Sequence, residues 1–355
     1  MPMEACFRRC PMNTETEILV KALNGFFYIY LPKQKCFSKN TVDSYKAAFK
    51  LFLDYMLEQN NSSLSQMSLD DFNNDNLAGF MDWLMAVRQN SPATCNQRLM
   101  AFRSFAKYLE IRDFALTSVY ADICKTPTKK TAAKVVDFLS EEALKTLLMQ
   151  PDTSNRTGIR NQCFMCLMYD TAARCQELLD IRLKDLFLNG NAPFVYLTGK
   201  GNKTRAVPLM KVTVNHLQRY LKLFHPDYGS RMDDYLFYTT SHGERHPMSR
   251  DTVQVFMKNY GRAAREICPD IPERVHPHQL RHTRAMHLYR GGMPLSILSE
   301  FLGHASEETT RVYAYADTEM KRKAIEKAIP KAIAFDENPI WDASDDEILR
   351  KLAGL

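Results

Sequence analysis

The chain has 355 residues, which is enough for two domains with separate hydrophobic cores. Hydrophobic residues make up 45% and charged residues 25%, as in ordinary globular proteins, and the formal net charge of +6 suits a polyanionic partner without requiring one. The sequence contains no apolar run of about 18 residues and no signal-peptide pattern, which argues against a membrane protein and predicts a cytoplasmic one. The 9 cysteines are odd in number and scattered, which argues against a disulfide framework.

The N-terminal part of the chain predicts a small helical bundle. Residues 1–12 show no periodicity and are expected to form a mobile tail. The bundle is expected to occupy residues 13–122, because apolar residues recur there at helical spacing. Four helices are predicted. The first begins at Thr14 and the second near Ser38. The third covers residues 77–84 and is preceded by Ser68, and the fourth follows Ser91-Pro92.

The last helix of this bundle carries basic residues away from its apolar face. Leu99 and Phe102 belong to the apolar face, whereas Arg98, Arg103 and Lys107 project elsewhere. Two interpretations are open. The basic residues are either solvated charges of a generic helical domain, or contacts from a helix that lies along DNA to its phosphates.

A basic linker is expected over residues 123–136. No acidic residue lies between Cys124 and Lys134. The segment carries four lysines, which are Lys125, Lys129, Lys130 and Lys134. A run of charge is often only a solvated surface. Here we favour a strap over the phosphate backbone, because the segment would join two DNA-binding domains.

The second domain is expected to span residues 137–330 and to be mostly helical with one small antiparallel sheet. Ser140 is a predicted N-cap for its first helix, with two glutamates in the first turn. The stretch FVYLTGKGNKTRAVPL predicts two strands around a tight turn that carries Lys200 at its tip. The fold class is therefore mainly α (α+β). The later stretch DDYLFYTTSHGERHPMS predicts a short strand followed by a loop.

Residues 277–315 predict three short helices that bring chemically useful side chains together. Pro277 suits a first helical position, and His278, Arg281 and His282 share one face of the helix that follows. A second helix is predicted to end at Gly303, just before His304. A third is predicted after Ser306 and carries Tyr313. Arginine and histidine can hold phosphate oxygens, and a phenolic oxygen can attack phosphorus.

Upstream residues complete a pattern that resembles a known family. The segment TAARCQELLDI places Arg174 before an amphipathic helix that carries Glu177. The ordered set Arg174, Lys200, His278-x-x-Arg281, Leu-Gly-His304 and Tyr313 resembles the tyrosine recombinase (phage integrase) family, and no position of the family pattern is missing. The stretch NQRLMAFRSFAKYL similarly resembles the family's N-terminal core-binding, SAM-like domain.

The resemblance implies a site-specific recombinase that cuts and rejoins DNA through a 3′-phosphotyrosyl intermediate at Tyr313, without ATP, metal or other cofactor. Arg174 and Arg281 are expected to hold the non-bridging oxygens, because a guanidinium donates two parallel hydrogen bonds. His278 is expected to accept the phenolic proton. Lys200 is expected to protonate the departing 5′ oxygen.

The remaining site residues are expected to play supporting roles. His304 is expected to donate a hydrogen bond to the phosphate, and Glu177 to orient Arg174. His282 is expected to form a structural hydrogen bond. A zinc site made by His278 and His282 is disfavoured, because no carboxylate accompanies the pair.

Two alternatives concern single residues. Tyr315 is a rival nucleophile, although Tyr313 has the family's interval from His304. Lys203 and Arg205 are rivals of Lys200, which the turn position and the family pattern favour.

Two alternatives concern function. A type IB topoisomerase uses similar chemistry to relax DNA, and a helix-turn-helix regulator would use residues 278–302. A regulator of this kind would not need Arg174, Lys200 or Tyr313. We therefore favour a recombinase that serves a mobile element.

The resemblance also implies partners. The first is double-stranded DNA with paired inverted-repeat core sites. The second is the chain itself, which would form a tetramer on two duplexes. Whether an accessory protein takes part is left open. Residues 331–355 predict a tether and a short docking helix. That helix would dock on its own catalytic domain or on the neighbouring protomer, and we favour the neighbour.

Overall fold

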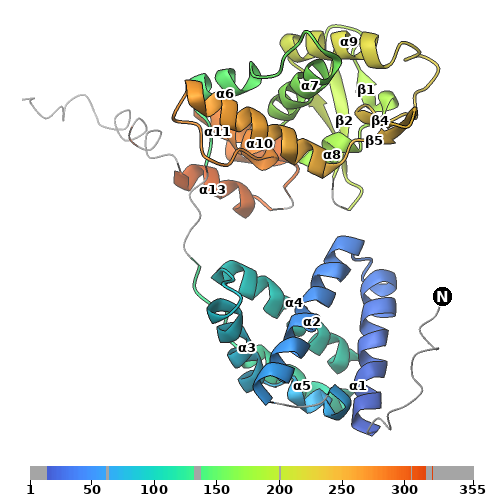
Figure 1. Ribbon diagram of the computed structural model, residues 1–355, viewed down its shortest axis with the longest axis vertical. Coiled ribbons are helices and arrows are strands. Elements are labelled where there is room, and N and C mark those ends of the chain that lie inside the picture. The colour runs from blue at the N-terminus through green and yellow to red at the C-terminus, as the bar shows by residue number, and fades with distance from the viewer. Residues whose placement is uncertain are drawn as a thin grey trace, which may run out of the picture. The chain divides into compact units, whose positions relative to one another are not determined.

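A computed structural model describes residues 14–60, 64–131, 137–199, 201–304, 306–316 and 322. The chain divides between Ala133 and Lys134 into two compact units, each built around its own buried core (Figure 1). Several predicted features lie outside the described residues: the N-terminal tail, Lys134, Lys200, and the C-terminal tether and docking helix.

In the described part of the N-terminal unit every regular element is a helix, as predicted. Its elements are α1 (Thr14–Gly25), η2 (Phe26–Gln34), α2 (Lys39–Asn60), η3 (Leu64–Gln66), η4 (Leu69–Asp71), α3 (Asn74–Ala86), α4 (Pro92–Arg112), η5 (Phe114–Leu116) and α5 (Thr117–Lys125).

Aromatic side chains hold these helices together. Phe49 and Phe52 of α2 pack on Phe102 of α4, with ring centroids 4.6 and 5.2 Å away, and Phe80 of α3 lies 5.4 Å from Phe52. Aromatic pairs at such distances add to the stabilisation that comes from burial alone. The predicted apolar face of α4 therefore forms the centre of this core.

Three local features differ from the predictions. Ser68 caps the short turn η4, and the side chain of Asn73 caps α3 instead. Residues 26–34 form a π-helix, which was not predicted. The start of the expected linker packs on this unit, since Thr126 is buried and the backbone N–H of Lys129 donates to the side chain of Asn96 at 2.8 Å.

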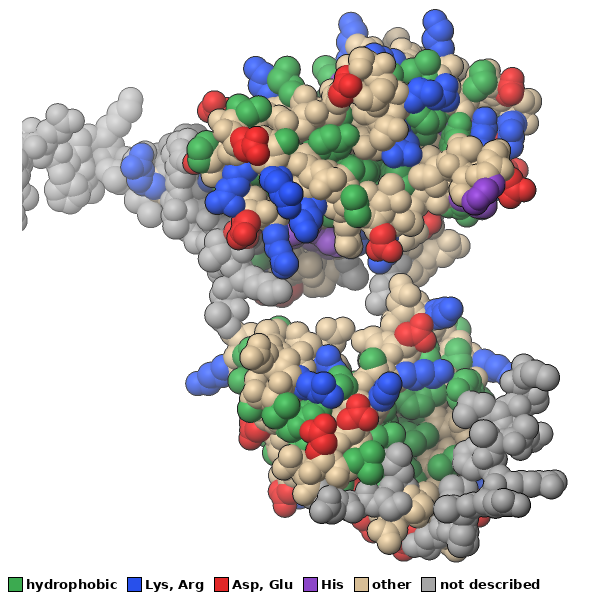
Figure 2. Space-filling model, in the orientation of Figure 1, with side chains coloured by type: hydrophobic (Ala, Val, Ile, Leu, Met, Phe, Trp, Pro, Cys, Tyr) green, Lys and Arg blue, Asp and Glu red, His purple; other side chains and the backbone are tan. Residues whose placement is uncertain are grey.

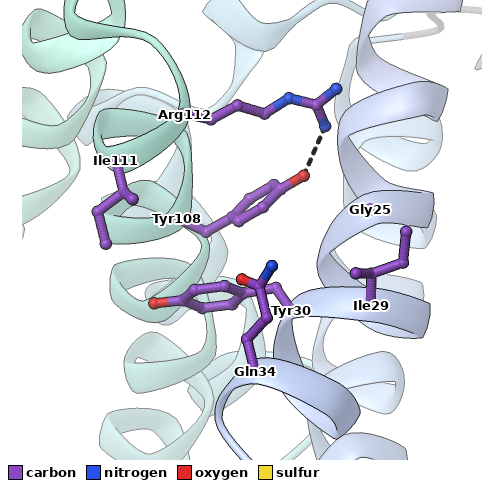
Figure 3. Close-up of a pocket in the computed structure, with 7 residues that line it drawn as sticks. All are labelled: Gly25, Ile29, Tyr30, Gln34, Tyr108, Ile111 and Arg112. Atoms are coloured by element: carbon purple, nitrogen blue, oxygen red, sulfur yellow. Dashed lines mark hydrogen bonds between the residues drawn. The ribbon is translucent and has the colours of Figure 1, made fainter.

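A shallow groove of about 340 Å³ runs between η2 and α4 (Figure 3). Tyr30 and Tyr108 line it, and Arg112 donates a hydrogen bond to the Tyr108 hydroxyl at 2.6 Å. The side chains of Ile29 and Ile111, which also line it, are half or more exposed. The π-helix thus leaves apolar surface on the outside of the unit.

The C-terminal unit is mostly helical and contains two small antiparallel sheets. Its elements are α6 (Glu141–Leu148), α7 (Arg156–Thr171), α8 (Cys175–Leu179), η6 (Leu183–Asp185), β1 (Leu186–Phe187), β2 (Phe194–Thr198), β3 (Thr204–Pro208), α9 (Lys211–Phe224), β4 (Tyr238–Ser241), β5 (Glu244–Pro247), α10 (Arg250–Ile267), α11 (Pro277–Arg290), α12 (Leu295–Leu302) and α13 (Glu308–Ala316).

The predicted hairpin is present, and a second hairpin accompanies it. Strands β2 and β3 pair in register from Phe194 with Pro208 to Thr198 with Thr204, and β1 extends the sheet. Strands β4 and β5 form a separate hairpin where only one strand was predicted. His242 and Gly243 both have positive φ, which is the backbone geometry of a tight hairpin turn.

The three predicted helices of residues 277–315 are confirmed as α11, α12 and α13. Helix α12 ends at Gly303, whose φ of +63° is the left-handed conformation that glycine adopts at helix ends. Tyr313 of α13 is buried in a small apolar cluster that includes Met286 of α11 and Leu298 of α12. This cluster fixes the three helices against one another beside the main core.

Candidate active site

Arg174 and Glu177 lie where α7 passes into α8. The carboxylate of Glu177 accepts hydrogen bonds from Arg174 Nη1 at 2.7 Å and from the backbone N–H of Arg174 at 3.0 Å. Burial would raise the pKa of Glu177, but hydrogen bonds from Arg205 and Arg174 outweigh it and hold this pKa below its usual value. The Arg174 side chain is 34% exposed, so it is oriented and still accessible.

Three arginines donate to consecutive carbonyl groups at the end of α12. Arg205 Nε contacts the oxygen of Phe301 at 3.0 Å, Arg281 Nη2 that of Leu302 at 2.8 Å, and Arg174 Nη2 that of Gly303 at 3.3 Å; each arginine also has a second partner. Carbonyls at the end of a helix lack partners within it and carry partial negative charge. These carbonyls therefore hold the three guanidinium groups close together at the end of α12.

Arg281 is the most deeply buried of these arginines, with 3% of its surface exposed. Its Nη1 donates to the carbonyl of Ala172 at 2.6 Å, at the end of α7. Burial, assisted by Arg174, lowers the pKa of Arg281 to about 10. The group therefore carries its charge at neutral pH and joins the ends of α7 and α12.

The Tyr313 hydroxyl is hydrogen-bonded to His282 Nδ1 at 2.9 Å. We expected a structural hydrogen bond from His282, but we expected the phenolic proton to pass to His278. The ring of His278 lies one helical turn away, 6.4 Å from that of His282. Burial raises the pKa of Tyr313, an effect that the Arg281 charge opposes.

His304 follows Gly303 directly and points its Nδ1 at the hydroxyl of Thr310, 2.8 Å away. Thr310 is fully buried, so the contact holds the imidazole in one orientation. Burial together with the charge of Arg281 lowers the pKa of His304 to about 4. His276, which was not among the predicted site residues, caps α11 by accepting from the backbone N–H of Gln279 at 3.2 Å.

The two low histidine pKa values predict a pH-dependent stability. Burial, with His278 and Arg281 nearby, lowers the pKa of His282 to about 4, like that of His304. Between pH 6.5 and 4 the unfolded chain therefore binds more protons than the folded one, so stability falls as the pH drops through this interval.

We expect the melting temperature of the free protein to be lower at pH 5 than at pH 7. The double variant His282→Gln, His304→Gln should show a smaller difference between the two pH values. An undiminished difference in thermal melts of the double variant would contradict this assignment.

The tip of the β2–β3 hairpin packs against the ion pair of Arg174 and Glu177. A Cβ added at Gly199 would lie 3.0 Å from Oε1 of Glu177 and 3.7 Å from Nη1 of Arg174. Lys200, the next residue, is outside the described residues. Arg205, a sequence rival of Lys200, is instead bonded to Glu177 and to α12.

The basic residues predicted to contact DNA are largely engaged within the N-terminal unit. Arg103 donates to the carbonyl of Thr126 at 2.7 Å. The exposed ion pairs are Lys107 with Glu110, Lys125 with Asp122, and Lys129 with Asp82. Arg98 is half-buried and Lys130 is exposed. On the face visible in Figure 2, basic side chains of this unit alternate with acidic and apolar ones.

Two other kinds of feature are absent from the described ranges. Within them, no group of three or more His, Cys, Asp or Glu side chains is placed to hold a metal ion. No helix in the same part of the chain is both long and apolar enough to cross a membrane.

Comparison with known proteins places the chain in a family. Residues 137–320 match the phage integrase family, and residues 26–113 match the SAM-like N-terminal domain of phage integrases. The chain therefore belongs to the phage integrase family, the tyrosine recombinases, and is an enzyme of tyrosine-type DNA recombination. This confirms the family resemblance that the ordered motifs indicated.

Relatives align with nearly the whole chain. A protein named as an integrase/recombinase, y4rC of Sinorhizobium fredii, is 29% identical over 318 residues, which cover 89% of this chain and 93% of the relative. The tyrosine recombinase XerD of Staphylococcus epidermidis is 29% identical over 308 residues, 85% of this chain and 97% of XerD.

Solved structures share the fold at lower identity. XerH bound to its difH substrate superimposes with a TM-score of 0.60 at 21% identity, covering 89% of this chain and 90% of XerH. The Tn1549 transposon integrase with transposon right-end DNA gives a TM-score of 0.64 at 16% identity, covering 90% of this chain and 100% of the solved fragment of the integrase.

Proposed function

We propose that this enzyme is a site-specific DNA recombinase in which Tyr313 attacks a DNA phosphodiester. The observation that carries the proposal is the arrangement around the end of α12. Arg174 and Arg281 donate to adjacent carbonyls there, and His304 follows the same helix end. The Arg281 charge acts on the Tyr313 hydroxyl. A phosphate that took the place of these carbonyls as hydrogen-bond acceptor would receive hydrogen bonds from both guanidinium groups.

The proposed chemistry forms one bond and breaks another. The Tyr313 oxygen forms a bond to phosphorus while the bond from phosphorus to the 5′ oxygen breaks, which leaves a 3′-phosphotyrosine. Arg174, Arg281 and His304 stabilise the charge on the non-bridging oxygens, and Lys200 protonates the departing oxygen. A 5′ hydroxyl from another strand reverses the step, and the energy of the phosphodiester is retained throughout.

The proton acceptor is one of two histidines on the same face of α11. A general base works best when its pKa is near the working pH, and a pKa of about 4 makes His282 a weak acceptor. Burial, together with the charge of Arg281, lowers the pKa of His278 as well. We propose that His282 holds the hydroxyl in the free protein and that His278, the histidine of the family pattern, accepts the proton during attack.

The DNA-contact residues of the N-terminal unit are part of the proposal as well. Lys130 is exposed and can meet a phosphate directly. Lys107 and Lys125 would exchange an exposed acidic partner for a phosphate, which costs little because exposed ion pairs are weak. Arg98 has a buried Nη1 without a hydrogen-bond partner among the described residues.

Assembly on DNA is proposed from the relatives. XerH has been crystallised on its difH substrate, and a lambda integrase dimer, which superimposes with a TM-score of 0.58 at 16% identity, on a core site. For this chain we propose binding to paired inverted-repeat sites as a tetramer that spans two duplexes.

The test is to trap the covalent intermediate. DNA fragments that flank the gene, nicked beside the candidate cleavage position so that the short fragment with the released 5′ hydroxyl diffuses away, should accumulate a protein–DNA adduct that resists denaturant. Exchange of strands between two sites, measured on labelled DNA, separates a recombinase from a topoisomerase, which would only relax supercoils. Absence of any adduct on these fragments would contradict the proposal.

Lys200 gives a prediction of its own. Lys200→Ala should slow cleavage of the natural site, because the 5′ oxygen then leaves without a proton. Replacing that bridging oxygen by sulfur should restore the rate, since a thiolate leaves unprotonated. Cleavage rates on the two substrates provide the measurement, with Lys203→Ala as the matched control from the same turn. Equal rescue of Lys203→Ala and Lys200→Ala would count against the assignment.

A further inference from the structure

Arg205 is a charged residue of the β2–β3 hairpin to which the proposed chemistry gives no part. It lies on β3 opposite Leu197 of β2, and its side chain is 15% exposed. Its Nη2 donates to Oε2 of Glu177 at 2.8 Å, and its Nε donates to the carbonyl of Phe301 at 3.0 Å. One guanidinium group therefore joins the hairpin, the start of α8 and the end of α12.

Glu177 divides its negative charge between two arginines. Its Oε1 accepts from Arg174, and its Oε2 accepts from Arg205 and from the backbone N–H of Arg174. The carboxylate is 4% exposed, so its hydrogen-bond partners in the folded protein are these protein groups and not bulk solvent. Without Arg205 the buried charge of Glu177 would be directed at Arg174 alone, which would pull this guanidinium away from a phosphate.

Two glycines let the backbone approach these side chains closely. A Cβ added at Gly303, where φ is +63°, would lie 2.9 Å from Nη1 of Arg205, and one added at Gly199 would lie 3.0 Å from Oε1 of Glu177. Both distances are shorter than ordinary van der Waals contact. Arg205 and Glu177 thus fill the space between the hairpin tip and the end of α12.

We propose that Arg205 is a positioning residue for strand cleavage, which acts through Glu177 to keep the guanidinium of Arg174 directed at the phosphate. The inference rests on the proposed function, because Arg174 must first be a phosphate ligand. A displacement of about 1 Å in such a group can cost roughly a hundredfold in rate. The effect should therefore be large even though Arg205 itself need not touch DNA.

The test compares two DNA substrates that differ in charge. One carries the natural phosphodiester at the cleavage position, and the other carries a neutral methylphosphonate, which has less need of a guanidinium. Arg205→Ala should slow cleavage of the phosphodiester by about tenfold to a hundredfold and affect the methylphosphonate far less. Arg174→Ala should show the same pattern more strongly, and Arg205→Lys, which retains the charge beside Glu177, should recover part of the rate.

A matched control separates positioning from stability. Arg284 and Asp170 form an ion pair of similar burial, 18% and 5% exposed and 3.1 Å apart. Arg284→Ala should lower the melting temperature to a similar degree and leave the ratio of the two cleavage rates unchanged.

Two results would overturn this inference alone: equal slowing of both substrates by Arg205→Ala, or a phosphodiester rate as high as that of Arg284→Ala. Absence of an adduct with the wild-type protein would overturn the proposed function and the inference together.

Discussion

Tyr313→Phe is expected to abolish the covalent protein–DNA adduct while binding of DNA survives. The substitution removes the proposed attacking oxygen and its hydrogen bond to His282, and it keeps the ring, which is 1% exposed in the cluster beneath α11 and α12. The fold should therefore persist. Adduct formation on a nicked site and a gel-shift titration measure the two properties separately.

Tyr315→Phe is the matched control, because Tyr315 lies on the same helix two residues further on. This variant should form the adduct at a rate close to that of the wild type. Adduct formation by Tyr313→Phe together with its loss in Tyr315→Phe would move the nucleophile to Tyr315.

Arg281→Ala should reduce cleavage by roughly a hundredfold to a thousandfold, the usual effect of removing one donor to a developing negative charge. Unlike Lys200→Ala, it should not be rescued by a bridging sulfur, because Arg281 is proposed to act on the non-bridging oxygens. It should also destabilise the protein, since its two hydrogen bonds join the ends of α7 and α12.

Single-turnover rates, corrected for the folded fraction from thermal melts, separate the two effects of Arg281→Ala. A rate restored by the sulfur substrate would show that Arg281 acts on the leaving group instead. Arg281→Lys provides the control for charge. It keeps a cation but lacks the planar guanidinium, whose two separate nitrogens donate to the carbonyls of Ala172 and Leu302.

Local signals in the sequence were sufficient for most of the helices. Ser140 caps α6 as predicted, α4 follows Ser91 as the Ser91-Pro92 signal indicated, and the spacing of His278, Arg281 and His282 correctly placed them on one helix. The π-helix of residues 26–34 escaped prediction because the apolar residues of FFYIYLPKQ are nearly continuous and show no period.

Tertiary contacts were the part of the site that the sequence could not supply. The pairing of Tyr313 with His282 depends on how α13 packs against α11, which spacing within either helix does not determine. Arg205 was noticed only as a rival of Lys200. Its bond to Glu177 joins residues 28 positions apart, and nothing local to either residue indicates the contact.

Around the end of α12, positively charged side chains outnumber negatively charged ones among the described residues. Arg174, Arg205 and Arg281 donate to its carbonyls, and the one carboxylate bonded within this group belongs to Glu177. Because carbonyls are dipoles and not anions, these four side chains retain two uncancelled positive charges. A phosphodiester under attack carries two negative charges on its non-bridging oxygens. In the proposed mechanism, bound DNA would halve the excess charge of these four side chains, and the pentacovalent phosphorus would bring it to zero.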